Sequence, residues 1–164
     1  MEIRTGKDSV AQRYGFRSGG GRNHVRYDHK IRPTSIDVIC PNCQGLAVAS
    51  DLISKEGSVL CVDMSASWNG KPFGVVCTKC TYKSSGSSYA ELPPPFHQIY
   101  VFGRKLWAWN SGHLNMIYLF LGGADIREHP YARLATYIHG DWKKKSRKFI
   151  REIERHVEKS ANPR

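Results

Sequence analysis

The sequence contains two short cysteine motifs, Cys40-Pro41-Asn42-Cys43 and Cys77-Thr78-Lys79-Cys80. In each motif two residues separate the cysteines, so one tight turn can point both sulfur atoms at the same metal ion. Two such turns supply the four thiolates of a tetrahedral structural zinc site, which leaves no coordination position for water or substrate. We therefore predict one structural Zn²⁺ ion bound by Cys40, Cys43, Cys77 and Cys80.

The residues around the two motifs favour tight turns and a hairpin between them. Pro41 restricts the first turn, and Gly45 permits the chain to double back on the ligands. The 33 residues between Cys43 and Cys77 are long for a zinc motif, and they contain the pattern of two strands. We predict strands over 58–64 and 72–76, joined by an Asn-Gly type I′ turn at 68–71.

With a hairpin between two cysteine knuckles, residues 38–90 resemble the zinc-ribbon superfamily, which includes the zinc ribbons of transcription factors. The resemblance covers about a third of the 164 residues. It implies a metal-binding β fold. Zinc ribbons serve DNA, RNA and protein partners alike, so the resemblance does not select among these functions.

The alternative for the cysteines is a pair of disulfides or a redox dithiol. The first seven residues contain no apolar signal-peptide core, and a reducing compartment favours zinc. Neither motif is followed by a helical pattern, as a thioredoxin-like site would require. The fifth cysteine, Cys61, lies between two apolar residues, and we expect it to be a small buried side chain.

The chain is predicted to have an α+β fold in three parts: a basic, flexible arm over 1–35, a zinc ribbon with an antiparallel β-sheet over 36–92, and a small helical part over 93–164. The last part begins with a strand over 98–102. A helix capped by Asn110 or Ser111 and ended by Gly122-Gly123 follows. Two further helices are expected, over 130–138 and from Asp141 as N-cap onwards.

The formal net charge is +11, and the charge is concentrated at the two ends of the chain. Residues 1–35 contain eight Lys and Arg against three Asp and Glu, and residues 141–164 contain nine against four. The 105 residues between them contain eight against seven. This segregation favours an acidic polymer as partner.

Two basic segments are candidates for binding nucleic acid. In the arm, cations alternate with glycines, and Tyr14, Phe16 and Tyr27 are available to stack on bases. In the C-terminal helix, six cations and no acid occur between positions 143 and 151. The predicted nucleic-acid-binding residues are Arg17, Arg22, Arg26, Lys143, Lys144, Lys145, Arg147, Lys148 and Arg151. The arm could equally dock on a protein, and the helix could be merely soluble.

The sequence contains no convincing catalytic motif. A zinc-supported nuclease of the His-Asn-His type would usually have its histidine between the knuckles, but all seven histidines lie outside 40–80. His113 at the start of a helix is the one loose candidate, and a core or capping role is favoured for it. The longest apolar run has six residues, 116–121, which is too short to cross a membrane.

Three classes of function remain after the sequence is read. We favour a non-catalytic zinc-ribbon protein that binds DNA or RNA, as a regulator or as a small subunit of a nucleoprotein assembly. A zinc-stabilised adaptor for protein partners is the alternative, and a nuclease is the third. The protein is expected to be intracellular, in the cytoplasm or associated with the nucleoid or nucleus, without contact with a membrane.

Overall fold

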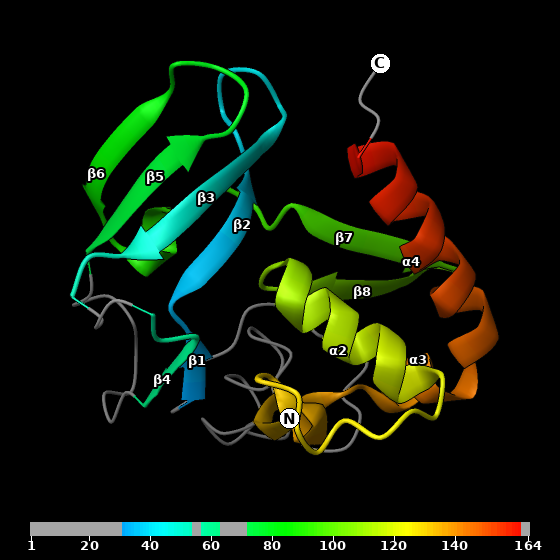
Figure 1. The fold of residues 1–164 in the computed structure, drawn as a ribbon. Helices are drawn as coiled ribbons and strands as arrows, with labels where there is room; N and C mark the ends of the chain where they lie inside the picture. The colour runs from blue at the N-terminus through cyan, green and yellow to red at the C-terminus, as the bar shows by residue number, and fades with distance from the viewer. Residues whose placement is uncertain (1–30, 54–56, 63–71, 162–164) are drawn as a thin grey trace, which may run out of the picture. The chain divides into compact units, whose positions relative to one another are not determined.

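The computed structural model describes residues 31–53, 57–62 and 72–161, which form antiparallel strands followed by helices (Figure 1). The predicted α+β class is therefore confirmed. The chain divides into two compact units. We call His29–His97 with Ala108–Leu114 the sheet unit, and Gln98–Trp107 with Asn115–Arg164 the helical unit. Of the predicted arm, residues 1–30 lie outside the described part, and β1 (Ile31–Pro33) begins directly after them.

The sheet unit is built on a four-stranded antiparallel sheet. Its strands are β2 (Ser35–Ile39), β3 (Leu46–Asp51), β5 (Phe73–Cys77) and β6 (Lys83–Ser87), in the spatial order β2-β3-β5-β6 (Figure 1). The strands β3 and β5 alternate buried and more exposed residues, as expected for strands with one face on a core. The buried apolar side chains of the three strands β2, β3 and β5 include Ile36, Val38, Ala47, Ala49, Phe73 and Val75.

The predicted hairpin between 58–64 and 72–76 is wrong. The strand β4 (Leu60–Val62) does form within the first segment, but it pairs with β1. The strand β5 forms within the second segment and pairs with β3 on one side and β6 on the other. The strand β3, which follows the first cysteine motif directly, occupies the neighbouring position that the prediction gave to 58–64. The predicted turn at 68–71 lies outside the described residues.

A buried hydrogen-bond network anchors the start of helix α2 (Ser111–Leu121). The Oδ1 atom of Asn110 accepts a hydrogen bond from His113 N at 2.9 Å, which confirms Asn110 as a cap. The carboxylate of Asp37 accepts a second helix-terminal amide, Ser111 N, at 3.0 Å, and lies 2.8 Å from His97 Nε2. The helix ends at Gly122 and Gly123, as predicted, and Gly123 has a positive φ of 79°.

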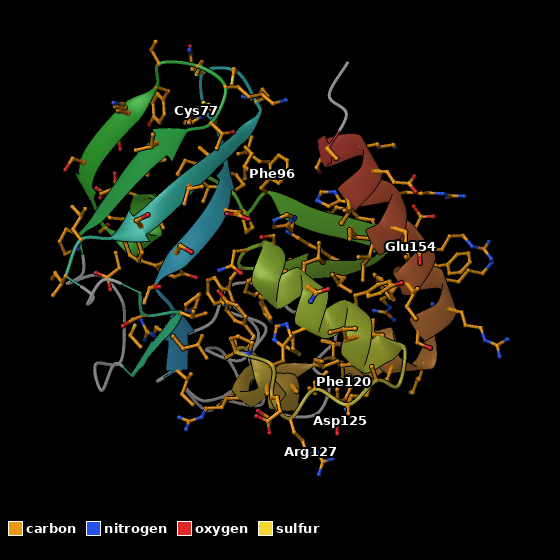
Figure 2. The ribbon with its side chains drawn as sticks, in the orientation of Figure 1. Cys77, Phe96, Phe120, Asp125, Arg127 and Glu154 are labelled. Carbon is orange, nitrogen blue, oxygen red and sulfur yellow. The ribbon has the colours of Figure 1, made fainter. Side chains whose placement is uncertain are left out.

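The helical unit begins with the hairpin of β7 (His97–Val101) and β8 (Arg104–Ala108). The 3-10 helix η3 (Ala132–Tyr137) follows α2, within the segment predicted as a short helix. Further along the chain, Glu154, which Figure 2 labels, accepts a hydrogen bond from the Tyr118 hydroxyl of α2 at 3.0 Å. The β7–β8 turn consists of Phe102 and Gly103, whose positive φ angles of 48° and 71° match a type I′ turn.

The single C-terminal helix of the prediction is divided into two, α3 (Gly140–Lys144) and α4 (Ser146–Ala161). The first of them, α3, is ended by Lys145 as its C-cap, whose φ of −116° and ψ of 27° depart from helical values. The prediction of Asp141 as N-cap is also wrong: His139 caps α3, since its Nδ1 atom accepts a hydrogen bond from Asp141 N at 3.4 Å. Both helices are anchored by apolar side chains, since Trp142, Phe149 and Ile153 are buried.

None of the helices in the described part of the chain is both long enough and apolar enough to cross a lipid bilayer.

Candidate functional site

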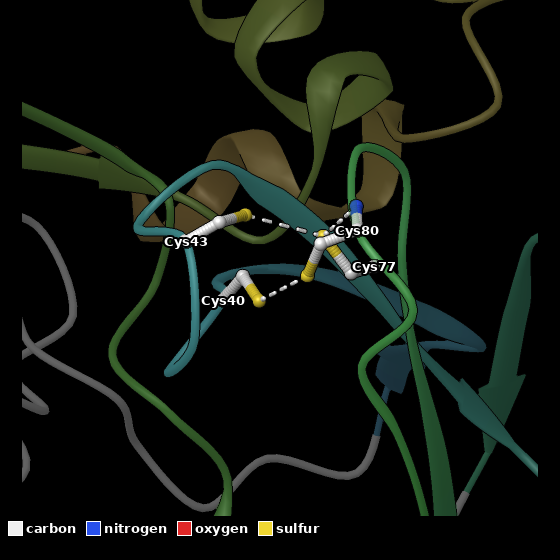
Figure 3. A group of neighbouring side chains, drawn as sticks. All are labelled: Cys40, Cys43, Cys77 and Cys80. Carbon is white, nitrogen blue, oxygen red and sulfur yellow. Dashed lines mark hydrogen bonds between the residues drawn. The ribbon is translucent and has the colours of Figure 1, made fainter.

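The four cysteines of the two motifs meet at one point of the sheet unit (Figure 3). Their Sγ atoms all lie within 4.8 Å of one another. Two contacts join sulfurs of different motifs: Cys40 to Cys80 at 3.7 Å and Cys43 to Cys77 at 3.5 Å. The structure therefore brings together all four residues that the spacing of the sequence predicts as ligands.

The sheet register explains why the two motifs meet. The first motif connects β2 to β3, where Ile39 faces Leu46, and the second connects β5 to β6, where Val76 faces Lys83. Because β3 and β5 are antiparallel neighbours with Ala47 opposite Cys77, both connections lie at the same end of the sheet. The backbone ladder thus positions the two turns side by side.

Both turns are closed by backbone hydrogen bonds. In the first, Cys40 N donates to the Gly45 carbonyl at 2.8 Å, and Gln44 N donates to the Cys40 carbonyl at 2.9 Å. In this turn Gln44 adopts the left-handed conformation, with φ of 59°. Glycine at position 45 is favoured because a larger residue would meet its neighbours there. A Cβ atom on Gly45 would lie 3.3 Å from Cys43 Sγ and 3.0 Å from Lys79 Cδ.

The sulfur spacing fits a shared metal ion and rules out disulfides in this arrangement. A disulfide needs a sulfur–sulfur distance of about 2.05 Å, and the shortest of these contacts is 3.5 Å. Four sulfurs at about 2.3 Å from one central ion lie about 3.8 Å apart in a tetrahedron. The two close contacts approach this value, so Cys40, Cys43, Cys77 and Cys80 can together hold one metal ion.

Backbone amides prepare Cys77 to bind a metal as the thiolate. The N–H groups of Lys79 and Cys80 each donate to Cys77 Sγ at 3.3 Å. The Lys79 amide is the strongest influence, and it helps to lower the pKa of Cys77 to about 6 against the opposing effect of burial. The cysteine spacing alone did not point to these amides, which belong to the second and third residues after the first cysteine of the C-x2-C turn.

The Cys43 thiol carries the opposite shift. The Gly45 amide is the strongest influence on it and lowers the pKa, but the Cys77 sulfur, burial and the other two thiols outweigh it and raise the pKa to about 12. Four thiols this close cannot all ionise without a compensating positive charge. A divalent cation supplies that charge, so binding one releases protons from the cluster.

The four cysteines differ in exposure: Cys40 and Cys77 are buried, Cys80 is half-buried and Cys43 is exposed. Four thiolates would be enough for a tetrahedral shell without a further ligand. Asn42 Nδ2 approaches Cys80 Sγ at 3.6 Å from the surface side. The fifth cysteine, Cys61, lies in β4 outside the cluster and is half-buried, so it is less enclosed than we expected.

The predicted basic residues of the C-terminus lie on α3, on α4 and at the break between them. Lys143 and Lys144 are in the last turn of α3, where cations interact favourably with the helix dipole. Five of the six cations are exposed and Lys145 is half-buried: the exposed ones are Lys143, Lys144, Arg147, Lys148 and Arg151. The predicted arm residues Arg17, Arg22 and Arg26 lie outside the described residues.

His113, the one candidate for a catalytic histidine, is 2% exposed. Its Nδ1 atom accepts a hydrogen bond from the Trp109 backbone N–H at 3.2 Å, and its own N–H donates to the Asn110 cap. This ring therefore takes part in the turn that begins α2.

No protein-family model matches the sequence, and comparisons with curated proteins and with solved structures found no significant match. The resemblance to zinc ribbons thus rests on the cysteine motifs and on the cluster that they form.

Proposed function

We propose that this is a non-catalytic zinc protein that binds DNA or RNA, as a regulator or as a small subunit of a nucleoprotein assembly. One Zn²⁺ ion is held by Cys40, Cys43, Cys77 and Cys80. Four thiolates in a tetrahedral arrangement favour zinc among the common divalent ions, because hard cations such as Mg²⁺ and Ca²⁺ prefer oxygen ligands. The ion has a structural role, and it stabilises the connections β2–β3 and β5–β6.

The observation that carries nucleic-acid binding is the charge pattern of α4. Arg147 and Arg151 are one turn apart on the side of the helix opposite the buried Phe149 and Ile153. Lys148 is exposed next to them. Among the described residues, the one ion pair within α4 joins Arg155 to Glu152, so Arg147, Lys148 and Arg151 have no acidic partner there. Such cations repel one another until an anionic ligand approaches.

The position of the cations at the start of α4 favours a role in binding an anionic ligand over a role in stabilising the helix. Arg147 and Lys148 lie in the first turn of α4, where positive charge opposes the helix dipole and weakens the helix. Phosphate groups would relieve this repulsion, and phosphate contacts of Lys and Arg provide most of non-specific affinity for nucleic acids. We therefore expect binding that depends little on sequence and strongly on salt.

A protein-interaction adaptor is the second candidate. It is favoured by an apolar surface of the sheet unit, where Leu52, Ile53 and Val76 are 54%, 64% and 48% exposed. A nuclease is the weakest candidate, because the His113 ring is buried and hydrogen-bonded within the first turn of α2.

The experiment is a titration of the purified zinc-loaded chain with duplex DNA, single-stranded DNA and RNA at two salt concentrations. About six phosphate contacts would weaken duplex binding by roughly a thousandfold between about 50 and 200 mM salt. The test variant is Arg147→Glu with Arg151→Glu. Its matched control is Lys83→Glu with Arg133→Glu, which changes the net charge equally at two exposed positions outside α4.

We expect the test variant to bind more weakly and with a shallower salt dependence, and the control to lose much less. Equal losses in both variants would mean that only the total charge matters, and would contradict a binding surface on α4. Absence of any nucleic-acid binding by the parent chain at low salt would leave the adaptor as the better candidate.

A further inference from the structure

The β7–β8 hairpin of the helical unit exposes two aromatic side chains. Tyr100 is 63% exposed and Phe102 is 72% exposed, the highest value among the large hydrophobic residues described as exposed. Both residues come from one short segment of chain, with Tyr100 in β7 and Phe102 in the turn that follows. Neither ring contributes to the apolar core.

Phenylalanine is also a conformationally unfavourable residue at position 102 of the turn. Its φ of 48° lies in the left-handed region, which Gly and Asn adopt readily and bulky side chains rarely adopt. The side chain therefore serves neither the turn conformation nor the core. This combination points to a ligand that uses the ring itself.

Lysine side chains approach each of these rings. Lys145 Nζ lies 5.1 Å from the centre of the Phe102 ring, and Lys105 Nζ lies 5.9 Å from the centre of the Tyr100 ring. A third pair in the same unit joins Lys143 to Phe120, whose side chain Figure 2 labels at the end of α2; the ammonium is 5.4 Å from the ring. Lys143 and Lys145 belong to the basic segment of α3 and the helix break, so the aromatic hairpin and the basic surface adjoin one another.

We propose that the tip of the β7–β8 hairpin, with Tyr100 and Phe102, is a stacking platform for unpaired bases of a single-stranded nucleic acid. The strand's phosphates contact Lys105, Lys143 and Lys145. This inference rests on the proposed function and adds to it the class of nucleic acid that the surface selects. Alternating exposed rings and cations are the means by which proteins hold single strands without reading sequence.

The preference for single strands follows from the accessibility of base faces. In a duplex each base is covered by its neighbours in the stack, so an exposed ring at a hairpin tip meets only sugar and phosphate. In a single strand the bases can splay apart and stack on an aromatic side chain. Each lysine that lies over a ring has a flexible side chain, so its ammonium can move from the ring to a phosphate when the base arrives.

The test uses Phe102→Asn in the full-length, zinc-loaded chain. Asparagine removes the ring and suits the left-handed turn position, so the hairpin is preserved. The probes are an oligothymidylate, an RNA of mixed sequence and a DNA duplex of equal length, all fluorescently labelled. We expect about a tenfold loss of affinity for the two single strands, and a change within about twofold for the duplex.

Phe102→Trp is the rescue variant, because it retains a stacking surface. It should restore the affinity for single strands, and its added indole fluorescence, measured as the difference from the parent chain, should be quenched by oligothymidylate and not by duplex. If the parent binds duplex through Arg147 and Arg151 but Phe102→Asn leaves single-strand affinity unchanged, the stacking platform is overturned while the proposed function stands. If the parent binds none of the three probes, both proposals are overturned.

Discussion

In the sheet unit four sulfur atoms lie within 4.8 Å of one another, whereas in the helical unit the exposed cations Arg147, Lys148 and Arg151 are distributed along α4. The sulfur cluster is held by the register of β2, β3, β5 and β6, so the sheet fixes the distances between its sulfurs. The cations project from a helix surface and need no fixed mutual distance. Loss of the first site should therefore be abrupt, and loss of the second should be graded.

The largest expected effect is loss of the metal. Zinc binding in small four-ligand sites contributes roughly 10–16 kcal/mol of apparent free energy, comparable with the roughly 5–15 kcal/mol stability of a whole domain. We expect Cys77→Ser, or a chelator, to abolish stoichiometric zinc and to unfold the four-stranded sheet. Metal analysis and near-UV circular dichroism measure this.

Cys61→Ser is the matched control for that variant, because Cys61 lies outside the cluster in β4. It should retain full zinc content. Retention of one zinc per chain by a double variant, Cys77→Ser with Cys80→Ser, would contradict the assignment of the ligands.

The second prediction concerns the apolar core of the helical unit. Phe149 is fully buried, with its ring centre 6.4 Å from that of Trp142. Phe149→Ala should lower the free energy of unfolding by about 3–5 kcal/mol, measured by denaturant titration. Val157→Ala, at a half-exposed position of the same helix, should change it by less than about 0.5 kcal/mol. Zinc content should remain stoichiometric in both variants, and release of zinc from Phe149→Ala would mean that the two regions are not separable.

The sequence predicts the cysteine cluster better than it predicts the pairing of the strands, and the reason is physical. All four cysteines of the cluster were identified, because the spacing of a C-x2-C turn is a local property of the chain. The pairing of β5 was not, because it depends on which distant strand takes the neighbouring position. The strand β3, with Ala47 and Ala49 on its buried face, lacks the β-branched and aromatic pattern that marked 58–64 as a strand.

In the C-terminal segment the sequence indicated helices and the basic residues, but not where the helices begin and end. Trp142 of α3 and Phe149 and Ile153 of α4 are buried apolar side chains. The break at Lys145 has no glycine or proline to mark it in the sequence. Histidine is a weak capping residue, so His139 was not recognised as the cap of α3. The nucleic-acid interface itself stays a prediction.

A third prediction concerns the precision of the sulfur cluster. A Cβ atom at position 45 would lie 3.3 Å from Cys43 Sγ, closer than ordinary contact, and the ligand cannot retreat without leaving the metal. Gly45→Ala should weaken zinc affinity by roughly tenfold, about 1.4 kcal/mol, in a competition titration with a colorimetric chelator. Gly122→Ala is the control, since its Cβ would lie no closer than 3.4 Å to any atom and far along the chain from the cluster. Equal zinc affinity in both variants would show that the cluster adjusts.

A fourth prediction is a dependence on pH in the helical unit. Burial is the main cause that lowers the pKa of His139; Asp141 raises it in part, and Arg104 lowers it. The neutral ring is the form that caps α3, because Nδ1 must keep a lone pair to accept the Asp141 N–H. With the folded pKa below the unfolded value of about 6.5, the folded state binds the proton less tightly than the unfolded state. The stability that this histidine contributes is thus complete above about pH 6.5 and is lost as the pH falls through the folded pKa.

His139→Ala should reduce stability by about 1 kcal/mol near neutral pH, and the difference from the parent should shrink as the solution is acidified. Comparing the two chains at each pH removes the contribution of zinc release, which both share. A difference that stays constant from neutral to acidic pH would contradict the capping role of the neutral ring.

The smallest effect is expected at the β7–β8 turn, where the structure keeps an aromatic ring at a cost in backbone conformation. Phe102 has a φ of 48°, a conformation that is unfavourable for bulky residues by about 1 kcal/mol or more. Phe102→Asn should therefore raise the free energy of unfolding by several tenths to about 1 kcal/mol, because asparagine tolerates this conformation. Phe102→Ala lacks the amide with which asparagine forms local hydrogen bonds in the left-handed region, so it should gain less. Both variants lose the Lys145 contact, so the difference between them isolates the backbone term. Thermal unfolding of both variants measures it. A gain in stability that accompanies weaker binding of single strands would indicate a residue retained for its ligand, whereas lower stability in Phe102→Asn than in Phe102→Ala would mean that the turn is not strained.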